Sequence, residues 1–127
     1  MKFIEAEDNV DAGLYQRMIS DDNKIEMGVY PVLFGYRVRA GYIGDSMYHI
    51  DWCAGNDQKI IALLYSILKN ILESGFDIKK LPGSSAIKPF YNDIAFTSFV
   101  NSLVVKPLNV IKLKSVELDR IKLMESI

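Results

Sequence analysis

The clearest hydrophobic pattern in the chain runs from Asp57 to Ser74. Apolar residues recur there every three or four positions and form one wide stripe, and polar residues occupy the opposite side. The stripe comprises Ile60, Ile61, Leu64, Ile67, Leu68, Ile71 and Leu72. Asn56 or Asp57 supplies an N-cap, and Gly75 supplies a left-handed stop. The pattern predicts a helix over about 57–74, whose buried side chains each contribute about 1.5–3 kcal/mol to stability.

A β-rich region precedes this helix. Residues from Ile25 to Tyr42 are rich in β-branched and aromatic types interrupted by glycine and proline, which favours a strand that bends. Residues 47–53 have the pattern of a second strand, and Gly44-Asp45-Ser46 has the composition of a hairpin loop. The sequence therefore predicts an antiparallel sheet built around a central hairpin, with strands over about 29–42 and 47–53.

The sorting of side chains predicts the register of this hairpin. A three-residue loop pairs Arg37 with Cys53 and Arg39 with Asp51 on one face, where His49 also lies. The opposite face then holds three apolar or aromatic pairs: Val38 with Trp52, Ala40 with Ile50, and Tyr42 with Tyr48. A two-residue loop would mix polar and apolar side chains on both faces. We therefore expect a three-residue loop, with the 57–74 helix covering the apolar face.

Further elements are predicted on both sides of this unit. Roughly helical spacing over 8–19 predicts a short first helix, and a short strand is expected over 76–81. A buried helix is expected over about 90–103, strand material over 108–113, and a terminal helix over about 116–125. The predicted fold class is α+β, with the helices after the hairpin packed mainly on one face of the sheet.

Composition is consistent with one folded core and limits the compartment. The chain has 127 residues, of which 50% are hydrophobic and 11% aromatic, which excludes a disordered tail. Because no repeat, linker or low-complexity tract divides it, we expect one globular domain over 1–127. A single cysteine, Cys53, and an early turn to acidic residues favour a soluble cytoplasmic protein with no membrane partner.

Acidic side chains concentrate near the amino terminus. Residues 1–26 carry three basic and seven acidic side chains, although the whole chain has a formal charge of only −1. This near-neutral balance argues against a dedicated nucleic-acid binder, which needs basic side chains to neutralise phosphates. Asp8, Asp11, Asp21 and Asp22 form a candidate docking surface for a basic partner, and a solvated acidic face is the alternative.

The polar face of the predicted hairpin is the second candidate surface. Arg37 and Arg39 beside His49 are suited to a carboxylate or phosphate, because arginine offers a planar fork of donors. The alternative is an ordinary cross-strand ion pair between Arg39 and Asp51, with Arg37 solvated. The choice decides whether this face binds a ligand.

Reactive residue types also gather on this face, but their spacing argues against catalysis. His49, Asp51 and Cys53 include the types of a nucleophilic triad. Strand residues two apart are separated by about 6.6–6.8 Å, whereas a nucleophile and its base must approach to about 3 Å. The chain has no metal-ligand spacing and no glycine-rich nucleotide loop, so we assign no catalytic residue, metal or cofactor.

Three function classes follow. The first is a non-enzymatic cytoplasmic protein that binds another protein, such as an immunity or antitoxin-like inhibitor of a basic toxin or enzyme. The second is a small anionic-ligand-binding protein, or a minor enzyme, that uses Arg37, Arg39, His49 and Asp51. The third is a homodimer that pairs through the uncovered sheet face or a strand edge.

Overall fold

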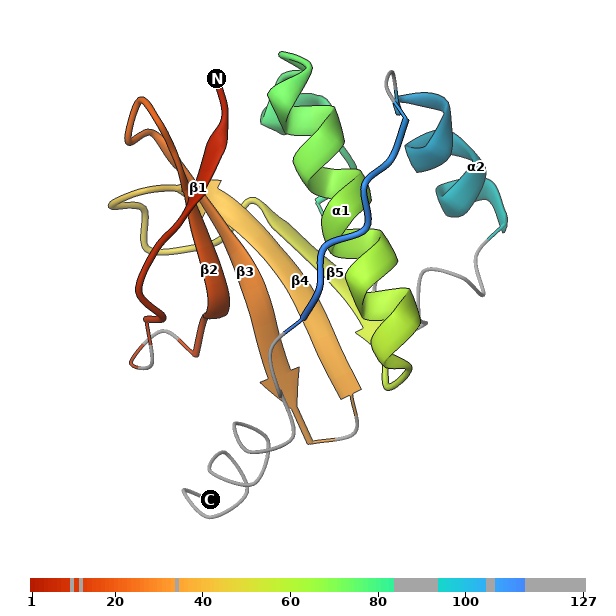
Figure 1. Cartoon of the computed structure of the whole chain (residues 1–127), viewed down its shortest axis with the longest axis horizontal. Coiled ribbons are helices and arrows are strands. Elements are labelled where there is room, and N and C mark those ends of the chain that lie inside the picture. The colour runs from red at the N-terminus through yellow and green to blue at the C-terminus, as the bar shows by residue number, and fades with distance from the viewer. Residues whose placement is uncertain (10, 12, 34, 84–93, 105–106, 114–127) are drawn as a thin grey trace.

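A five-stranded antiparallel sheet forms the framework of the computed structural model, which describes residues 1–9, 11, 13–33, 35–83, 94–104 and 107–113. The strands lie side by side in chain order: β1 (Phe3–Glu5), β2 (Tyr15–Ser20), β3 (Ile25–Val32), β4 (Gly35–Tyr42) and β5 (Ile50–Gly55). They are followed by the helix α1 (Gln58–Glu73), the short 3-10 helix η1 (Ile78–Lys80) and the helix α2 (Ile94–Ser102). The fold is therefore α+β (Figure 1).

Helix α1 lies across one face of the sheet and packs on β4 and β5 (Figure 1), and its bounds agree with the predicted helix. The Asp57 carboxylate accepts the N–H of Lys59 at 2.9 Å, and Gly75 follows the helix with φ 92°. The sheet side of this core holds fully buried side chains, namely Val38, Ala40, Ile50 and Trp52. The apolar stripe and the apolar face of the sheet thus bury each other.

The predicted register between β4 and β5 is confirmed, but the predicted loop length is wrong. Arg37 lies opposite Cys53, and Arg39 lies opposite Asp51. Strand β5 begins at Ile50, so the connection runs over 43–49 and Tyr42 does not pair with Tyr48. The Ile43 N–H donates to the Lys24 carbonyl at 2.9 Å, so at this end the chain continues its pairing toward β3. The register survives because it depends on the alternation of side chains rather than on the loop.

The expected bent strand over 29–42 is wrong, since it is the end of β3, a turn and strand β4. Val32 pairs with Gly35 and closes this hairpin. At Gly35 an added Cβ would lie 2.9 Å from the Gly55 carbonyl oxygen, so the close approach of the two chain segments requires glycine. The turn was difficult to predict from the sequence, because Leu33 is apolar and apolar residues are usually buried. In the structure Leu33 is 44% exposed.

The expected helix over 8–19 is also wrong, because this region contains strand β2. Tyr15 pairs with Val29 and Met18 pairs with Met27, so two residues of β2 oppose one residue of β3 in a β-bulge. Gln16 has the left-handed φ of 54° that this irregularity needs. The bulge places Tyr15 and Met18, three residues apart, on the same face of the sheet. A spacing of three imitates a helix, and this explains the error.

The remaining segments differ from the prediction in detail. The expected strand over 76–81 is wrong, because Asp77 caps the 3-10 helix η1 there. Residues 107–113 join no strand ladder among the described residues, so the expected strand over 108–113 is wrong as well. Helix α2 starts at Ile94, and both 90–93 and the predicted helix over 116–125 lie outside the described residues. No helix in the described part of the chain is long and apolar enough to cross a membrane.

Ser66 ties the 107–113 segment to α1, and its loss should loosen that contact. Its hydroxyl donates to the Ala62 carbonyl at 2.7 Å and accepts the Ile111 N–H at 2.7 Å. We expect Ser66→Ala to lower the free energy of unfolding by about 1 kcal/mol, the usual net value of one hydrogen bond. Amide hydrogen exchange at Ile111 should become faster. Ser102→Ala is the control, because the exposed Ser102 hydroxyl donates to the Phe99 carbonyl of its own helix at 2.6 Å, and unchanged exchange at Ile111 in Ser66→Ala would contradict the prediction.

Candidate functional site

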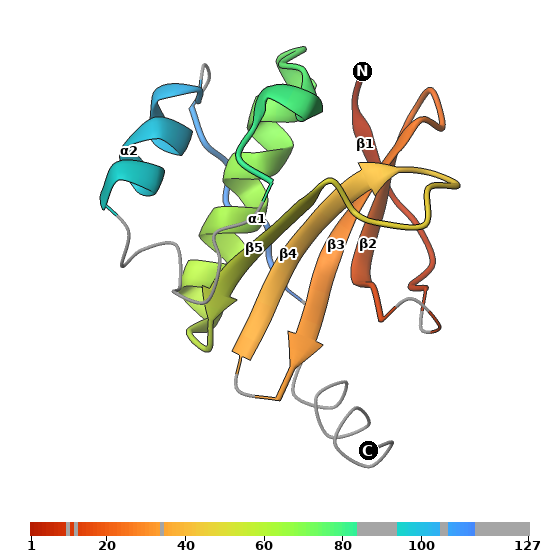
Figure 2. The same ribbon diagram turned by 180° about the vertical axis from the view of Figure 1, so that it is seen from behind.

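The sheet face opposite α1, here called the open face, carries charged side chains from four strands. Figure 2 shows the sheet from this side, with α1 behind it. Alternation along β4 and β5 places the buried residues toward α1 and every second side chain on the open face. Its charged residues are Arg17, Glu26, Arg37, Arg39 and Asp51. This face is the candidate functional site.

On the open face, two arginines of β4 share one carboxylate of the edge strand β5, and Arg37, Arg39 and Asp51 are named the arginine cluster below. The Nε atoms of Arg37 and Arg39 lie 2.6 Å and 3.2 Å from Oδ1 of Asp51. Nη2 of Arg39 donates to Oδ2 of Asp51 at 3.3 Å, and Nη2 of Arg37 donates to the Asp51 carbonyl at 2.8 Å. The expected Arg39–Asp51 ion pair is confirmed, and the expectation of a solvated Arg37 is wrong. The cluster carries a net charge of +1.

Tyrosine rings hold Arg39 in place. Its guanidinium carbon lies 3.7 Å from the centroid of the Tyr30 ring and 5.4 Å from that of Tyr48. Gly13 packs against the Tyr30 ring, since a Cβ added there would lie 2.1 Å from Cε2 of Tyr30. Stacking and the ion pair together restrict the guanidinium to one orientation, which lowers the entropy lost when it binds a partner.

The two tyrosines are site residues that sequence reasoning missed. Tyr30 lies opposite Arg37 in the β3–β4 ladder, so it could be placed only after β3 was separated from β4. Tyr48 was assigned to the apolar face but lines the open face beside Arg39. Burial raises the pKa of the Tyr48 phenol, and the negative charge of Glu26 raises it further, with Arg39 acting in the opposite direction. Tyr48 is therefore a neutral hydrogen-bond donor at physiological pH.

A hollow of about 350 Å³ opens beside the arginine cluster. It is lined by Arg39, Ser46, Met47, Tyr48 and Asp51. Met47 is 80% exposed, so a large apolar side chain stands at the rim of a charged hollow. A molecule bound in this hollow would contact both an anion-binding group, Arg39, and an apolar side chain, Met47.

The other predicted site residues are more dispersed. His49 is exposed and lies just beyond the last ladder pair, Ala40 with Ile50. The contacts that define the arginine cluster run from Arg37 and Arg39 to Asp51, and His49 takes no part in them. The structure thus assembles three of the four residues predicted for this face.

The four predicted acidic residues divide into two pairs at opposite ends of β2. Asp8 and Asp11 lie on the loop before the strand, and Asp21 and Asp22 lie in the turn after it. Asp8 lies beside the first half of β2, because its carboxylate accepts the Arg17 N–H at 3.5 Å, whereas Asp21 and Asp22 follow the end of the strand. Asp22 is used within its turn, where it accepts the Ser20 hydroxyl at 2.6 Å, and this bond lowers the pKa of its carboxyl group.

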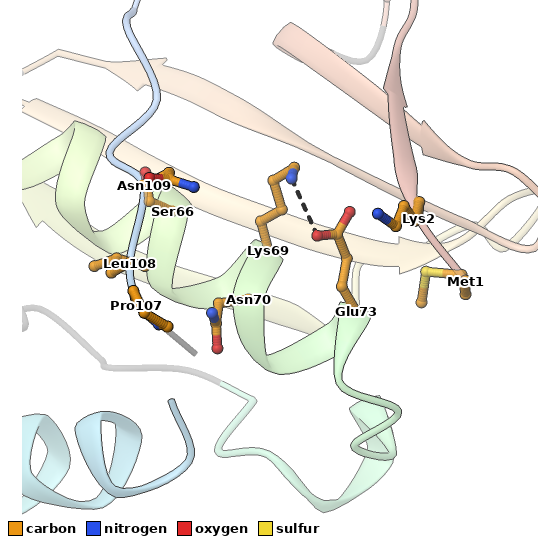
Figure 3. A pocket seen from close by; sticks show the side chains of 9 residues that line it. All are labelled: Met1, Lys2, Ser66, Lys69, Asn70, Glu73, Pro107, Leu108 and Asn109. Atoms are coloured by element: carbon orange, nitrogen blue, oxygen red, sulfur yellow. Dashed lines mark hydrogen bonds and ion pairs between the residues drawn. The ribbon is translucent and has the colours of Figure 1, made fainter. Parts of the chain in front are cut away.

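A second hollow, of about 270 Å³, lies on the outer side of α1 between residues 1–2 and 107–109 (Figure 3). Its polar groups serve internal contacts. Glu73 accepts the Phe3 N–H at 2.8 Å and the Lys69 ammonium at 3.1 Å, and the Ser66 hydroxyl holds Ile111. These bonds tie the amino-terminal strand and the 107–113 segment to α1, so this hollow has a structural explanation.

The described residues thus define an α+β protein with an arginine and tyrosine cluster on the open face of its sheet. Among them, no group of three or more His, Cys, Asp and Glu side chains is placed to hold a metal ion. Comparison with known families, curated proteins and solved structures gives no match.

Proposed function

We propose that this protein acts without catalysis, by binding another protein, and that the open face is its docking surface. The observation that carries the proposal is Arg39, whose guanidinium carbon lies 3.7 Å from the centroid of the Tyr30 ring, in the hollow that the exposed Met47 also lines. Arginine, tyrosine and methionine are enriched in protein interfaces, and the first two dominate binding energy when they are well packed. An immunity or antitoxin-like inhibitor in the cytoplasm is the concrete form of this proposal.

The acidic pairs favour a partner with a basic rim. Asp8 and Asp11 lie at one end of β2, and Asp21 and Asp22 lie at the other. Charges at the rim of an interface mainly increase the rate of association and select the partner, with less effect on the final affinity. A nuclease or another nucleic-acid enzyme presents such a basic surface, and association with it should slow as salt rises.

A matched pair of variants tests the docking surface. Met47→Asp places a charge on the open face, and Val110→Asp places the same charge on a 58%-exposed residue of the 107–113 segment, which runs along α1 (Figure 1). We expect wild type and Val110→Asp to recover the same stoichiometric partner from native cytosol. Met47→Asp should weaken that complex by about tenfold or more, equivalent to about 1.4 kcal/mol. Equal recovery by both variants, or no stoichiometric partner, would overturn the proposal.

A small anionic ligand is the second candidate, favoured by the hollow beside two arginines that share one carboxylate. In that case the protein is a ligand-binding protein or a minor enzyme that uses Arg37, Arg39, His49 and Asp51. A thermal-shift screen against carboxylates and phosphates tests it, because a bound ligand raises the melting temperature. A shift that disappears in Arg37→Ala would favour this candidate. If the partner is a second copy of the chain, light scattering will show the homodimer.

A further inference from the structure

We infer that the outer edge of β1 takes up a further β-strand, and that this strand is an extended basic segment of the partner. The inference rests on the proposed binding of another protein, and it specifies the structure and the charge of the partner segment at the border of the sheet. It is carried by the order of the strands, the direction of the β1 backbone groups and the charge along this edge.

The two edges of the sheet differ in what lies beside them. Strands β1 and β5 are the outermost strands (Figure 1). Beside β5, the Asp51 N–H donates to the Gly83 carbonyl at 2.7 Å, and the Trp52 indole N–H donates to the Pro82 carbonyl at 2.6 Å. Residues 82–83 therefore cover part of the β5 edge. In the described part of the chain no segment pairs with β1 on its outer side, so the sheet can be extended there.

The hydrogen bonds of β1 show which of its backbone groups point outward. The Ala6 N–H donates to the Arg17 carbonyl at 2.9 Å, so the backbone groups of Ala6 and Ile4 face β2. Phe3 and Glu5, which alternate with them, direct their N–H and C=O groups away from the sheet. Such groups on an edge strand are a template for pairing with another chain.

Glu5 offers both a donor and an acceptor at this edge. At Phe3 the N–H already donates to the Glu73 carboxylate at 2.8 Å. Among the described residues, the Phe3 carbonyl and both backbone groups of Glu5 have no partner. A neighbouring strand can therefore bond to the Glu5 N–H, to the Glu5 carbonyl and to the Phe3 carbonyl. In this mode of recognition, main-chain bonds supply affinity and side chains supply specificity.

The charge along this edge selects a basic strand. Residues 2–8 carry three acidic side chains and one basic side chain, and Glu5 and Glu7 are exposed. Opposite charges on neighbouring strands are favourable, whereas like charges directly opposite each other are destabilising. A second copy of β1 would bring its own acidic side chains to this edge. The occupant is therefore a different chain, with lysine or arginine in an extended segment.

A titration with short peptides tests the inference without the partner. The probe alternates lysine and valine over about six residues, the usual length of a strand, and has blocked ends. The control peptide carries glutamate in place of lysine, and each peptide is added to the full chain at constant ionic strength. We expect the basic peptide alone to shift the NMR signal of the Glu5 N–H. It should also slow the hydrogen exchange of that amide by roughly threefold or more, because a bonded amide exchanges only when the contact opens.

Two substitutions at Glu5 separate the effect of the charge from that of the backbone bond. Glu5→Gln removes the charge and keeps the N–H, whereas Glu5→Pro removes both, and proline is tolerated on an edge strand where the N–H faces outward. We expect Glu5→Gln to weaken binding of the basic peptide by about threefold and Glu5→Pro by about tenfold or more. The Ala6 N–H signal reports binding in both variants, and Trp52 fluorescence checks that they are folded.

Each failure has a separate meaning. Equal shifts from the basic and acidic peptides in wild type would overturn the inference, whether or not Glu5→Pro folds. A folded Glu5→Pro that binds the basic peptide as tightly as Glu5→Gln would overturn the strand pairing. If the basic peptide fails while Met47→Asp still disrupts a complex, docking stands and the edge inference does not. If the peptide binds but no stoichiometric partner exists, the strand edge stands and the docking function fails.

Discussion

Replacing Leu64 with aspartate should abolish the cooperative folded state. Leu64 is fully buried in α1, on the side that packs against β4 and β5. The substitution removes a leucine worth about 2–5 kcal/mol and buries a carboxylate that has no partner there. Together these costs reach about 5 kcal/mol or more, a large part or all of the stability of a domain of this size. Thermal unfolding followed by circular dichroism should show no sigmoidal transition.

The same helix supplies the control. Lys59 is exposed in the first turn of α1, so Lys59→Asp introduces the same side chain where water solvates it. A negative charge near a helix N-terminus is favourable, and the free energy of unfolding should change by no more than about 0.5 kcal/mol. A Leu64→Asp variant that melts cooperatively near the wild-type temperature would show that α1 does not organise the core.

The parts of the fold that were predictable are those in which side-chain periodicity is regular. Helix α1 has an uninterrupted stripe with a cap at each end, and both were visible in the sequence. The register of β4 and β5 followed from sorting Arg39 and Asp51 to one face and Val38 and Trp52 to the other. In both cases one face is buried, so a shift by one residue would expose the apolar set and bury the polar set.

The bulge in β2 and the turn between β3 and β4 could not be predicted, because each departs from the usual local sequence pattern. The bulge in β2 changes the spacing of side chains by one residue, and a pattern method interprets that change as a helix. The turn between β3 and β4 uses Leu33, a residue that composition assigns to a core. Both features depend on contacts between distant segments. Tyr65 of α1 donates a hydrogen bond to the Gln16 carbonyl in the bulge, and Gly35, the first residue of β4 after the turn, packs against Gly55.

The candidate site likewise has a part that the sequence predicted and a part that it did not. Arg37, Arg39 and Asp51 could be placed together because a single ladder aligns them. Tyr30 could not, since its position depends on the β3–β4 hairpin that the sequence concealed. Without Tyr30 the site is an ordinary surface ion pair of small energetic value. With it, the guanidinium is stacked and oriented, which is the basis of the functional proposal.

Tyr65→Phe should destabilise the protein by about 1–3 kcal/mol, because a buried carbonyl loses its donor. The Tyr65 hydroxyl is fully buried, and it donates to the carbonyl of Gln16 in the bulge and lies 3.4 Å from that of Met27. Phenylalanine fills the same volume, so the loss measures the hydrogen bond and not a cavity. Urea denaturation should show a lower midpoint with an unchanged slope. Tyr42→Phe, at a half-buried position, is the control and should cost less than about 0.5 kcal/mol.

Alkaline pH supplies a second signature of the same contact. Burial raises the pKa of the Tyr65 phenol far above its ordinary value, with smaller contributions from the negative charges of Asp8 and Glu5. The contribution of Tyr65 to stability is therefore complete below about pH 10, where the phenol is neutral in both states, and is lost as the unfolded chain ionises above it. Between about pH 10 and 11 the wild type should lose about 1 kcal/mol more than Tyr65→Phe, because the variant has no proton to release at this position. Parallel stability curves for the two proteins over that interval would show that the hydroxyl is not enclosed between α1 and the bulge.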